Sequence, residues 1–160
     1  MSDATYGELT VEGAARLFEQ LDLGQHDVFY DLGSGDGKVV LLAAVLCGVE
    51  RSVGVELDPD RHSVAVAMLS SAVASSAITS DEADRVSFVN GDAFAPRAFE
   101  GATVIYMLSN VFPPKLFGRF LTSLQSSHRT ARERCVSSRR AARFPLTSCG
   151  SSTKSLSTPL

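Results

Sequence analysis

The chain has 160 residues, 44% of them hydrophobic and 21% charged, and a formal net charge of −3. This length supports one domain core, and no apolar run is long enough to cross a bilayer. The three cysteines form no C-x-x-C pair, so neither a disulfide framework nor a zinc site is expected. We expect a soluble intracellular protein with no membrane partner and no metal.

The charge is divided unevenly along the chain. Residues 126–160 contain seven Lys or Arg and a single acid, Glu133, so most of the 18 acidic residues lie in residues 1–125. The same boundary separates clear apolar periodicity from a Ser/Arg-rich texture that cannot bury enough apolar surface to fold. We therefore predict a folded core over residues 1–125 and a disordered basic segment over residues 126–160, with at most a short helix near residues 130–142.

Helices and strands alternate along the predicted core, as a parallel sheet covered by helices requires. Thr10 is the expected N-cap of the first helix, Gly24 is expected to close it, and Gly48 is expected to end the second. In chain order we predict a first helix with Val11, Ala14, Leu17, Phe18 and Leu21 at helical spacing, a strand Val28–Tyr30, a helix Lys38–Cys47, a strand Ser52–Glu56, a helix Pro59–Ala74, strands Val86–Val89 and Thr103–Met107, and a helix opening at Pro113. The fold class is therefore α/β, with a Rossmann-like and mostly parallel sheet.

A glycine-rich turn follows the first strand, in the segment VFYDLGSGDGKVV. Gly33 allows the sharp turn after Asp31, and we expect Gly35 and Gly37 to leave room where a ligand approaches the main chain. The helix that follows directs its unpaired N–H groups toward that place. The plainer alternative is a tight strand-to-helix connection without a ligand.

The spacing and charge of this turn indicate which ligand it suits. Its G-x-G-x-G pattern differs from the G-x-G-x-x-G of dinucleotide sites and from the P-loop. Asp31 and Asp36 would repel a pyrophosphate but suit a cation, such as the ammonium and sulfonium groups of S-adenosylmethionine. The turn resembles the first motif of the class I methyltransferases.

Acidic residues also end the second and third strands, and ligands of such sheets bind at the carboxyl ends of the strands. Glu56 is placed to accept hydrogen bonds from two ribose hydroxyls, and the alternative is a solvated acid at a strand end. Asp58 is expected to cap the next helix. Asp92 is placed to accept the adenine amino group, with Ala93 beside the ring, although Asn90-Gly91-Asp92 is also ordinary turn chemistry.

The fourth strand runs into two polar residues, Ser109 and Asn110. In adenosylmethionine enzymes this strand end faces the transferable methyl group, where a side-chain carbonyl can orient the incoming nitrogen. These two residues are the candidates for that role. The alternative is a loop asparagine before a helix that opens with prolines.

Together these elements resemble the catalytic core of the disruptor-of-telomeric-silencing family, the non-SET enzymes that methylate lysine seventy-nine of histone H3. The resemblance rests on Tyr6-Gly7-Glu8 ahead of the first strand, then VFYDLGSGDGKVVL, GVEL, GDAF and VIYMLSN. It implies S-adenosylmethionine as cofactor, histone H3 in nucleosomes as partner, and the nucleus as location.

The resemblance also implies roles for single residues. The catalytic candidates are Asn110, Ser109 and Tyr6. The cofactor-binding candidates are Tyr6, Glu8, Thr10, Asp31, Gly33, Ser34, Gly35, Lys38, Glu56, Asp92, Ala93 and Asn110. The reaction would be direct displacement on the sulfonium, for which the protein holds the methyl carbon in line with a neutral lysine amine and excludes water.

The pattern departs from the family in two places. Lys38 follows the last glycine where the family often has glutamine, and no apolar alternation follows Cys135-Val136, where a fifth strand would be expected. We therefore expect a class I methyltransferase sheet that lacks its usual C-terminal strands.

Three alternatives remain open. The chain could be a class I methyltransferase for another protein lysine or a small molecule, or an adenosylmethionine-binding remnant without catalysis. A dinucleotide oxidoreductase is disfavoured by the loop spacing. The basic segment 126–160 is a candidate for non-specific contact with DNA phosphates, and its alternative is a solvated extension without function.

Overall fold

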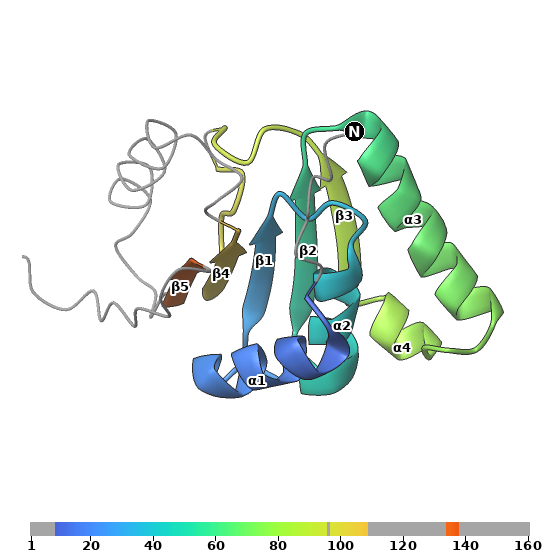
Figure 1. The fold of residues 1–160 in the computed structure, drawn as a ribbon, viewed down its shortest axis with the longest axis horizontal. Coiled ribbons are helices and arrows are strands. Elements are labelled where there is room, and N and C mark those ends of the chain that lie inside the picture. The colour runs from blue at the N-terminus through green and yellow to red at the C-terminus, as the bar shows by residue number, and fades with distance from the viewer. Residues whose placement is uncertain (1–8, 96, 109–133, 138–160) are drawn as a thin grey trace, which may run out of the picture.

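The computed structural model describes residues 9–95, 97–108 and 134–137. Over these residues five parallel strands form one sheet in the order β3-β2-β1-β4-β5 (Figure 1). The elements are α1 (Val11–Leu21), β1 (Val28–Leu32), α2 (Lys38–Cys47), β2 (Arg51–Glu56), α3 (Pro59–Ala74), α4 (Ser80–Ala83), β3 (Val86–Asn90), β4 (Val104–Met107) and β5 (Arg134–Ser137).

The elements predicted from periodicity form where they were expected over the described residues, with small shifts at the strand ends. The short helix α4 was not predicted. Its signal is a capping box, in which Thr79 and Glu82 exchange side-chain and backbone hydrogen bonds. The helix expected to open at Pro113 lies outside the described residues.

The helix caps show which local signals were decisive. The Thr10 hydroxyl accepts from the Gly13 N–H, and the Asp58 carboxylate accepts from the first turn of α3, so both predicted N-caps are confirmed. Gly48 ends α2 in the left-handed region, also as predicted. The prediction for Gly24 is wrong, because Asp22 takes the left-handed position after α1 with a φ of 51°.

The parallel pairing brings the carboxyl ends of the strands to one edge of the sheet. β1 lies in the middle, where Asp31 pairs with Gly54 of β2 on one side and with Tyr106 of β4 on the other. The chain order reverses at this point, since β2 and β3 continue in one direction and β4 and β5 in the other. Such a reversal is where open α/β sheets bind ligands.

Strand β5 corrects the prediction for the basic segment. Residues 126–160 were expected to be disordered or to form a short helix near residues 130–142, but Arg134–Ser137 pairs in parallel with β4, from Val104↔Arg134 to Met107↔Ser137. The sheet therefore continues past residue 125 and includes this fifth strand. A four-residue strand carries little periodicity of its own, and its pairing with the buried strand β4 determines its conformation.

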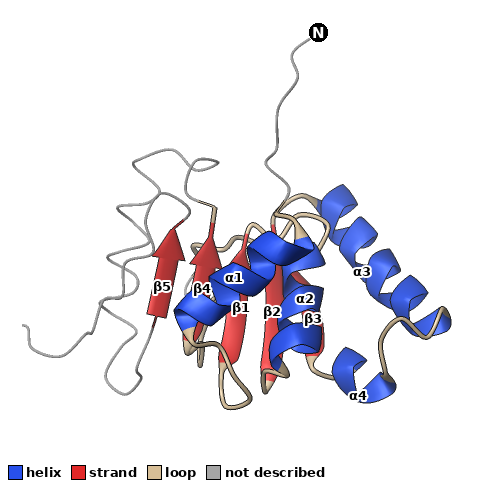
Figure 2. Ribbon diagram, turned by 60° about the horizontal axis from the view of Figure 1, so that its bottom comes forward, coloured by secondary structure: helices blue, strands red, loops and turns tan. Residues whose placement is uncertain are grey.

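Apolar residues cover both faces of the sheet, and Figure 2 shows α1 and α2 lying over one of these faces. On one face α1 and α2 pack on Phe29 of β1, and the Phe18 and Phe29 rings meet edge to face at 5.9 Å. On the other face Phe99 and Ala102, from the loop between β3 and β4, cover Ile105. Strands β1, β2 and β4 are thus covered on both faces, whereas the exposed Ser87 and Val89 leave one face of β3 open.

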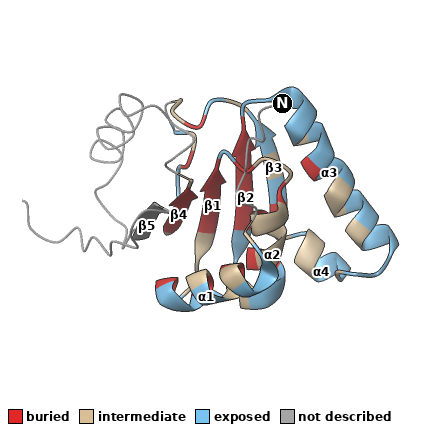
Figure 3. Ribbon diagram, viewed as in Figure 1, coloured by how far each residue is buried: buried red, intermediate tan, exposed pale blue. Residues whose placement is uncertain are grey.

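Helix α3 is attached more loosely. Ala65 is its one buried residue, and Figure 3 shows most of the helix as exposed. Its first turn nevertheless lies close to the carboxyl end of β2, where it borders the pocket described below. Among the described residues no helix is long and apolar enough to span a membrane.

Candidate functional site

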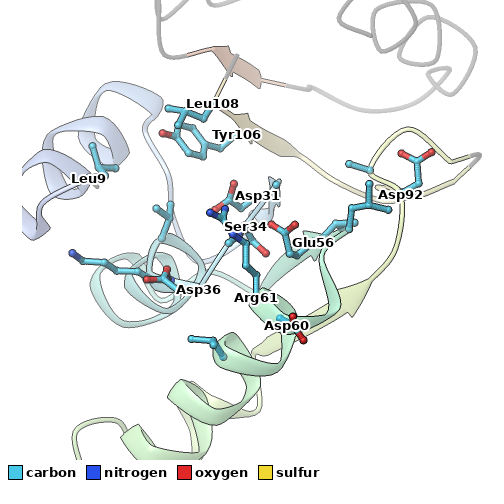
Figure 4. A pocket seen from close by; sticks show the side chains of 18 of the residues that line it. Leu9, Asp31, Ser34, Asp36, Glu56, Asp60, Arg61, Asp92, Tyr106 and Leu108 are labelled. Carbon is cyan, nitrogen blue, oxygen red and sulfur yellow. Dashed lines mark hydrogen bonds between the residues drawn. The ribbon is translucent and has the colours of Figure 1, made fainter. Parts of the chain in front are cut away.

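A cavity of about 760 Å³ opens at the carboxyl edge of β1, β2 and β4 (Figure 4). Its lining comes from the glycine-rich turn after β1, the start of α2, the end of β2, the first turns of α3, the loop after β3 and the end of β4. This volume is within the range of sites for small molecules and cofactors. The cavity lies at the reversal of strand order and at the carboxyl ends of the strands, and it is at these strand ends that the sequence placed the candidate site.

The glycine-rich turn is held against β2 by its own backbone. The N–H groups of Gly33 and Ser34 both donate to the Val55 carbonyl, at 2.8 and 3.2 Å. Gly33, Gly35 and Gly37 all have positive φ, at 85°, 56° and 83°. Any other residue would be strained at these positions. The turn therefore presents a fixed main-chain surface to the cavity.

The reason for Gly37 differs from the one predicted. An added Cβ there would run into the Phe88 ring of β3 and lie 3.0 Å from the Ala65 Cβ, so the protein's own core fills that space. At Gly35 the nearest atom to an added Cβ is Nη1 of Arg61, at 3.9 Å. Gly35 therefore leaves room toward the cavity, as predicted, whereas Gly37 allows the close packing of the turn on β3.

Glu56 connects the turn to the start of α3. Its Oε2 accepts from the Gly35 N–H at 2.8 Å, and its Oε1 accepts from the Asp58 N–H at 2.9 Å. The residue is 9% exposed and lines the cavity. Each carboxylate oxygen has a further lone pair, so both can still accept a hydrogen bond from a ligand hydroxyl.

Asp31 is the most perturbed acid at the site. It is 3% exposed, and its pKa is raised to about 7 by burial first, and then by the negative charges of Glu56 and Asp36. The pKa of Tyr106, on the neighbouring strand, is also raised, by burial and by the charge of Asp31. A buried carboxylate with two acids nearby favours a ligand that brings positive charge.

Asp92 and Ala93 border the cavity at the end away from Tyr106 (Figure 4). The Asp92 Oδ1 accepts from the Phe94 N–H at 2.8 Å, which is the local turn chemistry that the sequence left as an alternative. Asp92 is exposed and Ala93 is buried. The turn that contains Asp92 therefore also forms part of the cavity wall. The second oxygen of the Asp92 carboxylate can still accept from a ligand.

The structure brings together eight of the predicted cofactor-binding residues in this one cavity: Asp31, Gly33, Ser34, Gly35, Lys38, Glu56, Asp92 and Ala93. Thr10 is not among the lining residues, because its hydroxyl caps α1, and Leu9 lines the cavity instead. Tyr6, Glu8, Ser109 and Asn110 lie outside the described residues.

Sequence reasoning missed several lining residues. Arg61 comes from the first turn of α3, and its side chain extends toward the turn that contains Ser34 (Figure 4). Tyr106 could have been found from the register, because it pairs with Asp31 and therefore faces the same side of the sheet. Arg61 could not, because the direction of a long side chain is not fixed by its position on a helix.

The charge of the lining favours a cationic ligand. Five acids (Asp31, Asp36, Glu56, Asp60 and Asp92) and two bases (Lys38 and Arg61) line the cavity. A pyrophosphate would meet a negative surface here. Within the described part of the chain, no three His, Cys, Asp or Glu side chains are grouped so that they could hold a metal ion.

Comparison with known proteins shows which family has this arrangement. A family model described as "Histone methylation protein DOT1" matches residues 1–148. The chain belongs to the DOT1 family. The match continues past residue 125 and includes strand β5, so the fifth strand lies within the family's extent.

Two curated relatives match over shorter stretches. The chain is 45% identical over 53 residues to the H3 lysine-79 specific histone-lysine N-methyltransferase of Caenorhabditis elegans, which is 33% of this chain and 6% of the relative. It is 33% identical over 105 residues to a protein-lysine N-methyltransferase of Saccharolobus islandicus, which is 63% of this chain and 60% of the relative. The chain thus spans less than two thirds of either relative.

The fold has a close match among solved structures. An RNA methyltransferase from Salinibacter ruber, in complex with S-adenosyl-L-homocysteine, aligns with a TM-score of 0.59 and 33% identity over 71% of this chain and 66% of that one. This DOT1-family chain therefore has the Rossmann-like sheet of the class I methyltransferases, as predicted. The described part of that sheet contains five strands, one more than predicted.

Proposed function

We propose that this chain is an S-adenosylmethionine-dependent methyltransferase that modifies a lysine of histone H3, of the lysine-79 type, in nucleosomes. The observation that carries the proposal is the cavity itself. A rigid glycine-rich turn, a preorganised Glu56 and a buried Asp31 border one space at the strand reversal of a DOT1-family sheet. The activity, the substrate and the partner all belong to this proposal.

The residues present fit the cofactor. Glu56 would accept the two ribose hydroxyls through the lone pairs left by Gly35 and Asp58. Asp92 would accept the adenine amino group, with Ala93 beside the ring. The ligand's ammonium group would offset the charge of Asp31, which burial and two neighbouring acids make costly.

Further cofactor contacts are proposed around these three carboxylates. Ser34 and Gly35 would offer main-chain carbonyl oxygens from the turn, since their N–H groups already donate to Val55 and Glu56, and Lys38 would offer a positive charge to the ligand's carboxylate. Tyr6 and Glu8 are assigned to the methionine end through the family resemblance, whereas Thr10, which shares that resemblance, has its hydroxyl engaged in capping α1. Leu9, between Glu8 and Thr10, already lines the cavity, which supports that assignment.

Methyl transfer depends on how the two reactants are positioned more than on proton transfer. The bound cofactor supplies a methyl group on a good leaving group. The chain must hold the acceptor amine in line with that methyl and keep water away. Asn110 and Ser109, assigned to this role with Tyr6, follow directly after Leu108, which lines the cavity at the end of β4. A side-chain carbonyl there would orient the amine.

Histone H3 as substrate, chromatin as partner and the nucleus as location rest on the family. The curated histone methyltransferases are matched over 6 to 8% of their length, so most of each of those proteins is not compared. A non-histone protein lysine is the second candidate. The protein-lysine N-methyltransferase of Saccharolobus islandicus favours it, since 60% of that relative is matched.

The deciding experiment measures transfer of labelled methyl by the full chain. Recombinant nucleosomes, nucleosomes whose H3 has arginine in place of lysine-79, and a mixture of non-histone proteins serve as substrates. The proposal expects label on the first only, and loss of label with Glu56→Gln but not with the exposed Asp81→Asn on α4. Label on the non-histone proteins alone would support the second candidate. Transfer to none of them, by protein that binds S-adenosylhomocysteine, would indicate a binding remnant.

The DNA contact proposed for residues 126–160 needs a variant that spares β5. Deleting the segment would remove Arg134–Ser137 from the sheet. Replacing Arg139, Arg140 and Arg143 with glutamine removes three charges beyond that strand. If the segment contacts phosphates, nucleosome affinity and its salt dependence should both fall. An unchanged salt slope would exclude the contact.

A further inference from the structure

One acid at the site has an environment that ligand binding must change. Asp31 is the second-last residue of the central strand β1 and is 3% exposed, although it lines the cavity. Glu56 and Asp36 add negative charge from β2 and from the glycine-rich turn, and both raise the pKa of the Asp31 carboxyl. Burial and like charge act in the same direction, since each disfavours the ionised carboxylate.

The other titratable groups of the cavity come from every element that borders it. They are Tyr106 on β4, Asp36 in the glycine-rich turn, Lys38 at the start of α2, Glu56 at the end of β2, Asp60 and Arg61 on α3, and Asp92 after β3, while the apolar Leu9 lines the cavity from just before α1. No ion pair between Asp31 and a base is found among the described residues. The negative charges that raise its pKa come from Glu56 and Asp36.

We propose that Asp31 holds a proton in the unliganded pocket and releases it to solvent when the ligand's ammonium group binds beside it. This inference rests on the proposed function, because it takes the amino-acid end of the cofactor as the cation. Binding at this site is then coupled to proton release. The ammonium replaces the proton as the positive partner of a carboxylate whose ionised form is disfavoured by burial and by Glu56 and Asp36.

The coupling selects for one part of the ligand. A ligand that has the amino-acid chain releases a proton from Asp31, because its ammonium stabilises the carboxylate. A ligand with the same adenosine but without that chain leaves Asp31 protonated. The release of a proton from Asp31 thus distinguishes S-adenosylhomocysteine from 5′-methylthioadenosine, in addition to the contact between the Asp31 carboxylate and the ammonium group.

Calorimetry with the full chain can count this proton. S-adenosylhomocysteine is titrated at pH 6, 7 and 8 in two buffers of different ionisation enthalpy, and 5′-methylthioadenosine is titrated in parallel. A pKa of about 7 gives release of about 0.9 proton at pH 6, about 0.5 at pH 7 and about 0.1 at pH 8. Over the same range the Kd of S-adenosylhomocysteine should fall about tenfold, and 5′-methylthioadenosine should release none.

Three variants locate the proton. Asp31→Asn should abolish the release and the pH dependence of the Kd. Asp36→Asn keeps the side-chain oxygen that accepts from the Lys38 N–H but removes one negative charge near Asp31, so the release should remain and its midpoint should move to lower pH. Asp81→Asn, an exposed acid-to-amide change on α4, should change neither quantity.

The outcomes separate the inference from the function on which it rests. S-adenosylhomocysteine that binds with less than about 0.1 proton released at pH 6 would overturn the inference and leave the cofactor assignment standing. Proton release that persists in Asp31→Asn would overturn it as well. No binding of S-adenosylhomocysteine at any pH would overturn both the proposed cofactor and the inference.

Discussion

The two ends of strand β1 carry an aspartate each, and the two are held in opposite ways. Asp27, just before the strand, has both oxygens occupied, since Oδ2 accepts from the Gly24 N–H at 3.0 Å and Oδ1 accepts from the Thr103 hydroxyl at 2.7 Å. Asp31, near the end of the strand, is more deeply buried and lies near two other acids.

The difference shows that the two ends of one strand have different roles, one in the stability of the fold and the other in ligand binding. The network at Asp27 continues through Thr103 to the Val28 N–H and connects the beginnings of β1 and β4. Its polar groups are satisfied within the protein, as buried groups usually are. At Asp31 no ion pair within the described residues balances the negative charge of the carboxylate, so a bound ligand would have to supply the positive charge. That pattern is typical of a site whose unliganded form is less stable than it could be.

The largest expected effect concerns the free energy of unfolding, which depends on pH through the raised pKa of Asp31. Its pKa is higher in the folded chain than in the unfolded chain, so the folded state holds the extra proton and stability falls as pH rises from about 4 to 7. Asp31→Asn removes this dependence. Relative to wild type, the variant should gain on the order of 2 to 3 kcal/mol between pH 5 and pH 8 in urea denaturation. An equal difference at both pH values would contradict the raised pKa.

Substitution of Glu56 tests whether cofactor binding depends on the hydrogen bonds that hold this carboxylate in place at the carboxyl edge of the sheet. In Glu56→Gln only one side-chain oxygen remains, so either Gly35 or Asp58 loses an acceptor. The amide NH2 that replaces the other oxygen also cannot accept from a ribose hydroxyl, and losing that proposed hydrogen bond to a charged group corresponds to about 2 kcal/mol, so the Kd of S-adenosylhomocysteine should rise roughly thirtyfold. A matched control is Glu12→Gln in the first turn of α1, for which the Kd should not change.

Thr103 tests the stability end of the strand. Thr103→Val keeps the shape but leaves the Val28 N–H and one Asp27 oxygen without this partner. The free energy of unfolding should fall by about 1.5 kcal/mol, because partly buried polar groups lose hydrogen bonds. Calorimetry should give an unchanged Kd for S-adenosylhomocysteine. A weakened Kd would show that the two ends of β1 are not independent.

Ser34 gives the smallest expected effect. Among the described side chains, its Oγ is the one buried polar atom without a hydrogen-bond partner, and the residue is 6% exposed. Ser34→Ala removes an unsatisfied hydroxyl, so stability should stay the same or rise by up to about 1 kcal/mol. Thermal denaturation measures this. A loss of stability would mean that the hydroxyl has a partner, such as a water molecule.

Much of the site could be predicted because its signals are local. The turn after β1, the acid at the end of β2 and the Asp92 turn each lie within a few residues of a strand end, and parallel pairing brings strand ends together. The perturbation of Asp31 could not be predicted in the same way. It depends on how deeply three separate elements bury one carboxyl, which no local pattern records.

The fold shows the same limit. Helices α2 and α3 were predicted with their bounds, because their apolar and capping patterns are long. Strand β5 was not, because four residues with little periodicity acquire their conformation by pairing with β4. Gly37 was assigned to a ligand because the sequence does not show that the Phe88 ring, about fifty residues away along the chain, fills the space beside it.

Gly54 has a consequence for folding. It pairs with Asp31, and an added Cβ there would lie 2.7 Å from the Ser34 hydroxyl oxygen and 2.8 Å from the Phe88 ring. If β2 slipped by one residue relative to β1, Val53 or Val55 would bring a branched side chain to this position. The packing beneath the turn therefore rejects misaligned strand pairing, so a chain that completes this packing has also placed its carboxylates correctly.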